Sequence, residues 1–168
     1  TFAENPIEPA YAELAPPACY ATERLTFHPG RTGIVEIGAR QDGFAFDCER
    51  PRHRVFLHPH SVSSRKVTNG EWAGFIADGG YRTATLWLSD GWEWVRRKRI
   101  EAPLYWREDQ HFTHSGWQSR NPDAPVTHIS YYEADAFASW ARARLPTEFE
   151  WEAIGQGHDP AGGHQLLP

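Results

Sequence analysis

In two stretches of the chain, side chains of similar character recur at every second position, as they do on one face of a strand. In residues 32–39 the set Val35 and Ile37 alternates with Ile34, Glu36 and Gly38. In residues 53–62 a similar alternation places Val55 and Leu57 in one set. A period of two residues is typical of a strand whose faces differ in their surroundings. Both stretches are therefore predicted as strands, joined by a connection rich in turn-forming residues.

Three further stretches carry the pattern of a helix start. Each has Ser or Thr followed three residues later by Glu, so that the hydroxyl caps an N3 amide while the Glu reaches back to the N-cap amide. The pairs are Thr68 with Glu71, Ser130 with Glu133, and Thr147 with Glu150. Loss of such an N-cap typically destabilises by about 1 kcal/mol. Helices are predicted to follow all three.

Apolar spacing gives these helices their faces and ends. The first has Trp72, Phe75 and Ile76 on one side and stops at the Gly pair 79–80. The second carries a stripe around Phe137 and stops before Pro146. The third has Phe149 and Ile154 near one face and is predicted to end at its glycines, Gly155 and Gly157.

The third helix start contains an unusual series of acids. In RLPTEFEWEA, residues 144–153, Glu148, Glu150 and Glu152 occupy alternate positions. They form either a catalytic cluster or the start of a helix. Negative charge is favoured in the first turn, where Glu148 and Glu150 lie, and Glu150 also completes the capping box. We interpret the series as a helix start.

The region between the first two helices is rich in large aromatics. Residues 86–109 hold Trp87, Trp92, Trp94 and Trp106 among Gly and Pro breaks. Large rings bury much area at a low entropic cost, so the segment is predicted as short strands and turns fixed by aromatic packing. The basic run RRKR, residues 96–99, is interpreted as the solvated face of a hairpin.

Charge and composition narrow the classes of function. Acidic residues number 22 against 17 basic ones, a net charge of −5, which gives no reason to expect nucleic acid or an anionic membrane as partner. No apolar run is long enough to span a bilayer. Residues 1–30 are Pro-rich and are predicted as a linker. Because the chain lacks Met and ends in a Gly/Pro-rich stretch, we expect a piece of a longer polypeptide.

The candidate chemistry from spacing alone is sparse. Cys19 and Cys48 lie in predicted loops, without a base nearby in sequence, and are interpreted as reduced thiols of a cytoplasmic protein. His58 and His60 share one face of the second predicted strand, and His53 is near them in sequence. These three histidines are therefore the candidate ligands of a metal ion. Pro59 and the absence of a further ligand at suitable spacing argue against that site.

Seven motifs in order resemble one family. They are GIVEIG, FAFDCERPRHRV, VTNGEWAGFIADGGY, LWLSDGW, APLYW, PVTHISYYEADAFASWA and RLPTEFEWE. The series resembles the formylglycine-generating-enzyme-like (sulfatase-modifying-factor) domain, in the version found in ergothioneine-biosynthesis sulfoxide synthases. NPIEPAY, residues 5–11, is similar to the linker that precedes this domain in that family. One departure is FDCE, where the family commonly has FDNE, so Cys48 is interpreted as a tolerated loop thiol.

The resemblance implies an irregular, C-type-lectin-like α+β fold, truncated at its C-terminal end. Residues 31–168 would be the N-terminal two-thirds of the domain. It implies an Fe(II)- and O2-dependent enzyme that joins cysteine or γ-glutamylcysteine to trimethylhistidine and oxidises the sulfur. The iron would be bound by a missing N-terminal helical-bundle domain and the substrates mainly by the missing C-terminal remainder. No catalytic residue, substrate-binding residue or cofactor is therefore assigned to this chain.

Other functions stay open at this point. A related iron-dependent oxidoreductase could act on a different thiol or histidine derivative. A lectin-like fold can also serve as a non-catalytic binding module. Formylglycine generation from a sulfatase Cys would need a Cys pair in the missing C-terminal third.

Overall fold

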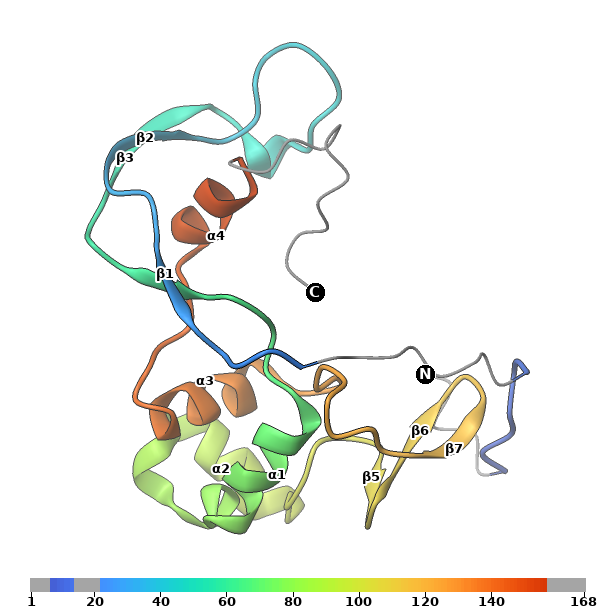
Figure 1. Ribbon diagram of the computed structural model, residues 1–168. Helices are drawn as coiled ribbons and strands as arrows, with labels where there is room; N and C mark the ends of the chain where they lie inside the picture. Colours follow the sequence, from blue (N-terminus) through green and yellow to red (C-terminus); the bar gives the residue numbers. More distant parts are fainter. Residues whose placement is uncertain (1–6, 14–21, 157–168) are drawn as a thin grey trace. The chain divides into compact units, whose positions relative to one another are not determined.

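The computed structural model describes residues 7–13 and 22–156, which form two compact units. The first unit comprises residues 7–13, 22–23 and 67–145. The second comprises residues 24–66 and 146–156, so it is assembled from two stretches that are far apart in sequence. Each unit combines helices with antiparallel strands (Figure 1), which confirms the predicted α+β class.

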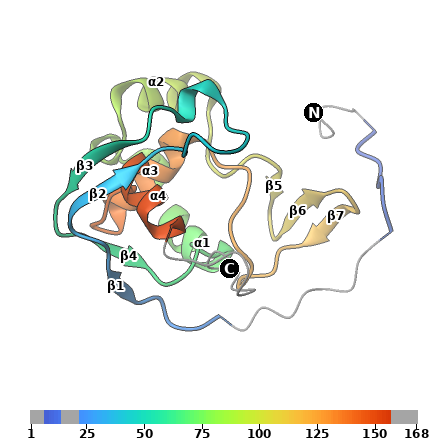
Figure 2. The same ribbon diagram turned by 90° about the horizontal axis from the view of Figure 1, so that it is seen from above.

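A helix packed on a hairpin makes up much of the second unit. Strands β2 (Gly33–Ile37) and β3 (His53–Leu57) pair antiparallel, with Val35 opposite Val55. Helix α4 (Glu148–Gly155) lies against both strands (Figures 1 and 2). The core between them is Ile37, Leu57 and Ala153, flanked by Val35 and Val55. The alternation of Val and Ile or Leu predicted this buried face correctly.

Helix α4 buries small and acidic side chains and leaves an aromatic one exposed. Glu150 and Ala153 are 5% and 1% exposed, whereas Phe149 remains 39% exposed. A small Ala side chain allows the helix to approach the hairpin closely. The aromatic ring of Phe149 instead lies edge-on to His53 at the margin of this contact, with ring centroids 5.9 Å apart.

A second strand pair completes this unit. Strands β1 (Phe27–Pro29) and β4 (Ser61–Ser63) pair antiparallel, with Phe27 opposite Ser63. The single strand predicted over residues 53–62 is therefore two strands, β3 and β4, separated at residues 58–60. Pro59 lies at this break, where its missing N–H cannot serve a ladder. Strand β1 lies within the stretch predicted as a linker.

All three capping boxes start helices. They precede α1 (Asn69–Ala77), α3 (Tyr131–Trp140) and α4, and in each box both reciprocal hydrogen bonds are present. Helix α1 ends before Gly79, whose φ of 77° is left-handed. In the described part of the chain, every helix is too short or too polar to cross a membrane.

Aromatic packing between α1 and α3 forms the core of the first unit. The rings of Trp72 and Phe137 are stacked with centroids 4.9 Å apart and planes inclined by 7°. Phe75 is fully buried and contacts Trp72, Phe137 and Tyr81. The short 3₁₀ turns Gly80–Arg82 and Ala84–Leu86 lead from α1 across this core. Trp87 belongs to the same core, and its Nε1 donates to the carbonyl of Gly80 at 2.8 Å.

The segment predicted as strands and turns contains a helix. Helix α2 (Ser89–Lys98) buries Gly91 and Val95, four residues apart on one face. The basic run is not a hairpin face, because Arg96, Arg97 and Lys98 form the exposed last turn of α2. Positive charge is favourable there because the helix C-terminus is electronegative. Arg99 ends the helix in a left-handed conformation with φ of 53°.

Gly91 brings α2 against α3, and its substitution has a predictable effect. A Cβ at this position would lie 2.7 Å from Cβ of Tyr132, which α3 holds in place. We expect Gly91→Ala to lower the free energy of unfolding by about 1–3 kcal/mol, as overpacked cores do, measured by urea denaturation. Gly155→Ala is the control, since a Cβ there meets nothing within 4 Å and α4 should gain up to about 1 kcal/mol. Equal effects at both positions would contradict the close packing of α2 on α3.

A small antiparallel sheet projects from the first unit. Strands β5 (Trp106–Arg107), β6 (Gln110–Thr113) and β7 (Gly116–Ser119) follow one another in space as in sequence (Figure 1). Phe112 on β6 is opposite Trp117 on β7, and Arg107 on β5 is opposite Gln110. This sheet carries the aromatic and charged side chains described below.

Candidate functional site

The acidic series of α4 is structural. Glu150 accepts from the backbone N–H of Thr147 at 2.8 Å and is buried. Glu152 Oε1 accepts from the N–H of Gly38 at 2.7 Å and from Nε2 of Gln156 at 2.9 Å. Glu148 lies exposed in the first turn. The prediction that these acids start a helix is confirmed, and Glu152 in addition fastens that helix to the hairpin.

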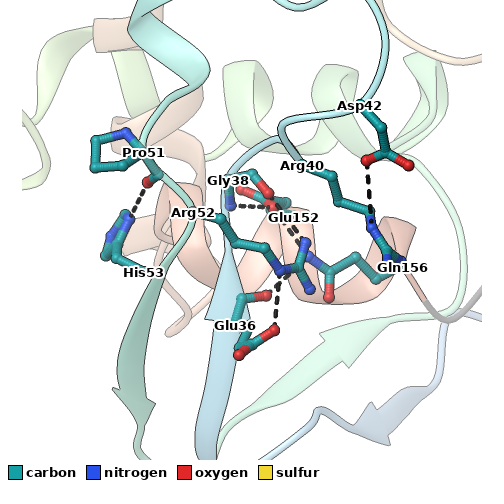
Figure 3. A network of polar contacts seen from close by, with 9 residues as sticks. All are labelled: Glu36, Gly38, Arg40, Asp42, Pro51, Arg52, His53, Glu152 and Gln156. Carbon is teal, nitrogen blue, oxygen red and sulfur yellow. Dashed lines mark hydrogen bonds and ion pairs between the residues drawn. The ribbon is translucent and has the colours of Figure 1, made fainter.

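A polar network surrounds this attachment (Figure 3). Arg52 donates to the carboxylate of Glu36 at 2.9 Å and to the carbonyl of Gly38 at 3.0 Å. Gln156 Nε2 also reaches the carbonyl of Glu36 at 3.0 Å. Gly38 has φ of 98°, and a side chain there would lie 3.0 Å from two carbonyl oxygens. The network thus holds the backbone of Gly38 in a conformation that glycine adopts readily. Through Glu152 and Gln156 it joins α4 to β2.

The three candidate histidines have separate neighbours. Nδ1 of His53 is 2.9 Å from the carbonyl of Pro51, and a carbonyl can only accept, so the proton is on Nδ1. The His58 ring lies edge-on to Phe56, with centroids 5.2 Å apart. His60 is 6% exposed in its side chain, with Nδ1 2.9 Å from the carbonyl of His58 and 3.7 Å from Glu150. These contacts are typical of packed or capping histidines.

Within residues 7–13 and 22–156, no group of three or more His, Cys, Asp or Glu side chains is placed to hold a metal ion. We therefore predict that anaerobic calorimetry with Fe(II) will show no tight one-to-one binding to the 168-residue chain. His58→Ala should leave the titration unchanged. Stoichiometric binding that His58→Ala abolishes would instead give His53, His58 and His60 a metal-binding role.

The two cysteines differ in what can be described. Cys48 is a free, exposed thiol in the 3₁₀ turn Asp47–Glu49, where its N–H donates to Asp47 at 2.9 Å. That position agrees with its interpretation as a loop thiol. Cys19 lies outside the described residues, as do His158 and His164.

A carboxylate is clamped at the sheet of the first unit. Nη1 and Nη2 of Arg107 donate to the two oxygens of Glu8 at 3.0 and 2.7 Å, and Trp117 Nε1 donates to Glu8 Oε2 at 2.7 Å. The Arg107 guanidinium also lies over the Trp117 ring, 4.4 Å from its centroid. Hydrogen bonding by Trp117 lowers the pKa of the Glu8 carboxyl, and Arg107 lowers it further, although burial acts in the opposite direction. Two donors on different strands thus converge on one anion.

A second stacked cation lies on the same sheet. Arg120 is 3.8 Å from the centroid of the Trp106 ring and donates to the carbonyl of Glu108 at 2.9 Å. Burial lowers the pKa of Arg120, while Asp109 opposes that change. Burial also lowers the pKa of His111, and electrostatic interactions with Arg120 and His128 lower it further. Since the ordinary pKa of histidine is about 6.5, the His111 ring is neutral at pH 7.

Two hollows flank this cluster, and Trp106 lines both. One, of about 220 Å³, is lined by the Glu8 clamp and the aromatic side chains of the sheet, namely Tyr105, Trp106, Phe112 and Trp117. The other, of about 210 Å³, lies between α1 and the sheet and includes Ala73, Ile76 and Arg120. Stacked guanidinium groups and indole rings are suited to recognise anions and planar groups. This cluster is the candidate binding site of the described residues.

No pattern in the sequence predicts this cluster. Glu8 lies in the stretch predicted as a linker, and Arg107 is 99 residues further along the chain. No local pattern connects positions so far apart. The density of Trp in residues 86–109 did indicate aromatic packing, but it did not reveal the pairing of each Arg with a ring.

The sequence was compared with known protein families. Residues 21–162 match the family described as the sulfatase-modifying factor enzyme 1-like domain, which is most of the chain. The chain belongs to this family. The resemblance stated from the seven motifs is thereby confirmed at the level of the domain.

Individual relatives include two kinds of enzyme. The chain is 42% identical over 132 residues to the hercynine oxygenase of Mycobacterium tuberculosis, covering 77% of this chain and 31% of that protein. For the hercynine oxygenase of Mycolicibacterium thermoresistibile the identity is 40% over 133 residues, covering 79% and 30%. The formylglycine-generating enzyme of Thermomonospora curvata is 32% identical over 145 residues, covering 74% and 46%. The chain spans about a third of the length of the hercynine oxygenases it matches.

Proposed function

We propose that this chain is part of a sulfoxide synthase of ergothioneine biosynthesis. The observation that carries the proposal is its similarity to hercynine oxygenases, at 37–42% identity, against 32% for the formylglycine-generating enzyme of Thermomonospora curvata. The higher identity favours the hercynine-acting branch of the family over the sulfatase-modifying branch. Residues 31–168 would then be the N-terminal two-thirds of the catalytic domain.

The reaction we propose joins a thiol, cysteine or γ-glutamylcysteine, to the imidazole carbon of trimethylhistidine. One C–S bond and one S–O bond form, while the S–H bond of the thiol and the ring C–H bond break. O2 accepts four electrons in total, so that one oxygen atom enters the sulfoxide and the other leaves as water with both hydrogens. Fe(II) would be the site of oxygen activation.

The described residues do not fit a site for this iron. They hold no cluster of three His, Cys, Asp or Glu ligands, and the side chain of His60 is packed among protein groups. We therefore assign the iron to a part of the polypeptide outside residues 7–13 and 22–156. For the described residues we propose a supporting role, in which the α1–α3 core and the β5–β7 sheet form a scaffold for the site.

The test is an assay of the full-length protein expressed from the source gene. It would be loaded with Fe(II) and given O2, trimethylhistidine and either cysteine or γ-glutamylcysteine, with the sulfoxide detected by mass spectrometry. We expect product with one of the two thiols and none without O2. The 168-residue chain alone should give none.

Three other outcomes would replace this proposal. Oxidation with a different thiol or histidine derivative would indicate a related iron-dependent oxidoreductase. Conversion of the Cys in a sulfatase peptide, with no sulfoxide formed, would place the protein in the formylglycine-generating branch. Neither activity in the iron-loaded full-length protein would indicate a non-catalytic, lectin-like binding module.

A further inference from the structure

Residues Ile7–Glu13 lie along the turn between β6 and β7, far from their own place in the sequence. The amides of Tyr11 and Ala12 both donate to the carbonyl of His114, at 2.7 and 3.1 Å. Ser115 Oγ donates to the carbonyl of Glu13 at 3.0 Å. These bonds tie three consecutive residues of the segment to the turn.

Glu8 provides the charged end of this attachment. Its carboxylate receives three hydrogen bonds, two from Arg107 on β5 and one from Trp117 on β7. Bidentate pairing of a guanidinium with a carboxylate fixes direction as well as distance. Arg107 also lies over the Trp117 ring, so the two donors contact each other as well as the carboxylate. The pair therefore forms a receptor for one carboxylate.

The backbone of Glu8 supports the same conclusion. Its φ is 42°, in the left-handed region, although it is not glycine and precedes Pro9. A residue before proline is normally restricted to extended conformations. Such a conformation persists only where surrounding contacts determine it. Here those contacts are the receptor on one side and the bonds to His114 on the other.

We propose that Arg107 and Trp117 form a carboxylate receptor that fastens residues 7–13, through Glu8, to the β5–β7 sheet. The segment is thus a tether and not a free linker. It holds residues 7–13 along the β5–β7 sheet. The proposal is independent of the reaction proposed above, since it concerns only contacts within the first unit.

Hydrogen exchange at two amides tests the tether directly. The N–H groups of Tyr11 and Ala12 are protected only while the segment is docked on His114, so their exchange reports docking. Glu8→Gln removes the negative charge while keeping the shape of the side chain. We expect it to accelerate exchange at both amides about three- to tenfold. This lies between the effect of losing an exposed ion pair and that of losing a hydrogen bond to a charged group. Trp117→Phe, which keeps a ring but loses the N–H donor, should act in the same direction.

The controls separate docking from general stability. Glu13→Gln makes the same change of charge in the same segment, but Glu13 joins the turn through its backbone carbonyl and should leave exchange unaltered. The amide of Phe112, which donates to the carbonyl of Tyr105 at 2.9 Å, reports on the sheet itself and should also be unaltered. Unchanged exchange at Tyr11 and Ala12 in Glu8→Gln would overturn the proposal. Equal acceleration at Phe112 would also overturn it, since Glu8 would then stabilise the sheet and not the tether.

Discussion

Phe75→Ala is expected to lower the free energy of unfolding of the first unit by about 3–5 kcal/mol, the range for deleting a buried aromatic ring. Phe75 is 0% exposed and contacts four other rings, those of Trp72, Tyr81, Phe137 and Trp140. Gly80 abuts the same ring, since a Cβ there would lie 2.1 Å from it. Removing Phe75 leaves a cavity bordered by rigid aromatic groups, which cannot collapse to fill it.

Urea denaturation followed by tryptophan fluorescence measures this loss well. Seven of the eight Trp residues lie in the first unit and Trp151 alone lies in the second. Tyr131→Ala is the matched control, because Tyr131 lies in the same unit, is 63% exposed and should change stability by no more than about 0.5 kcal/mol. A loss below about 1 kcal/mol for Phe75→Ala would mean that the aromatic cluster is loosely packed in solution.

Glu133→Ala should be the second most damaging substitution, lowering the free energy of unfolding by about 2–4 kcal/mol. The carboxylate is 2% exposed and serves two donors. One oxygen accepts from the N–H of Ser130 at 2.7 Å, completing the capping box of α3. The other accepts from the Tyr81 hydroxyl at 2.6 Å. The substitution would therefore leave that hydroxyl buried without its acceptor. Burial and the neighbouring carboxylate raise the pKa of Tyr81, so its hydroxyl stays a donor at neutral pH.

A double-mutant cycle identifies the part played by Tyr81. Tyr81→Phe removes the buried hydroxyl, so Glu133→Ala should be less damaging in that background than in the parent chain. Glu148→Ala is the surface control, since Glu148 is exposed in the first turn of α4, and it should have an effect of about 0.5 kcal/mol or less. Strictly additive effects of Tyr81→Phe and Glu133→Ala would contradict a coupled pair.

The elements that the sequence predicted well are those whose signals are local. A capping box spans three residues, so Thr68, Ser130 and Thr147 identify their helices without reference to the rest of the chain. The alternation around Val35 and Val55 likewise depends only on neighbouring positions. For the same reason the acids of α4 could be interpreted as structural before the fold was known.

Helix α2 shows where local signals mislead. Asp90 and Gly91 together suggest a turn, and the Trp residues suggest strands. Gly91 is instead a packing residue, required because Tyr132 on α3 lies against it. That requirement arises from tertiary structure and is invisible in a window around Gly91. The basic residues at positions 96–98 were in fact consistent with a helix C-terminus, a signal that the aromatic pattern outweighed.

The candidate site was beyond prediction for a related reason. Glu8 meets Trp117 across 109 residues of sequence, and neither has neighbours that announce the contact. Single Arg and Glu residues on a surface are common and usually solvated. Only the fold places Arg107, Trp117 and Glu8 together, so this part of the site required the structure.

The discontinuity of the second unit has a consequence for synthesis on the ribosome. The N–H of Gly38 is bonded to Glu152, 114 residues later. Helix α4 ends at Gly155, 98 residues after β3 ends at Leu57, so at about 5–20 residues per second the completed β2–β3 hairpin waits roughly 5–20 s before α4 emerges to cover it. During that interval Ile37 and Leu57, which lie under α4 in the finished unit, face solvent or whatever else is near. The nascent hairpin is therefore exposed to misassociation until α4 is complete, and a chaperone would protect it during that interval.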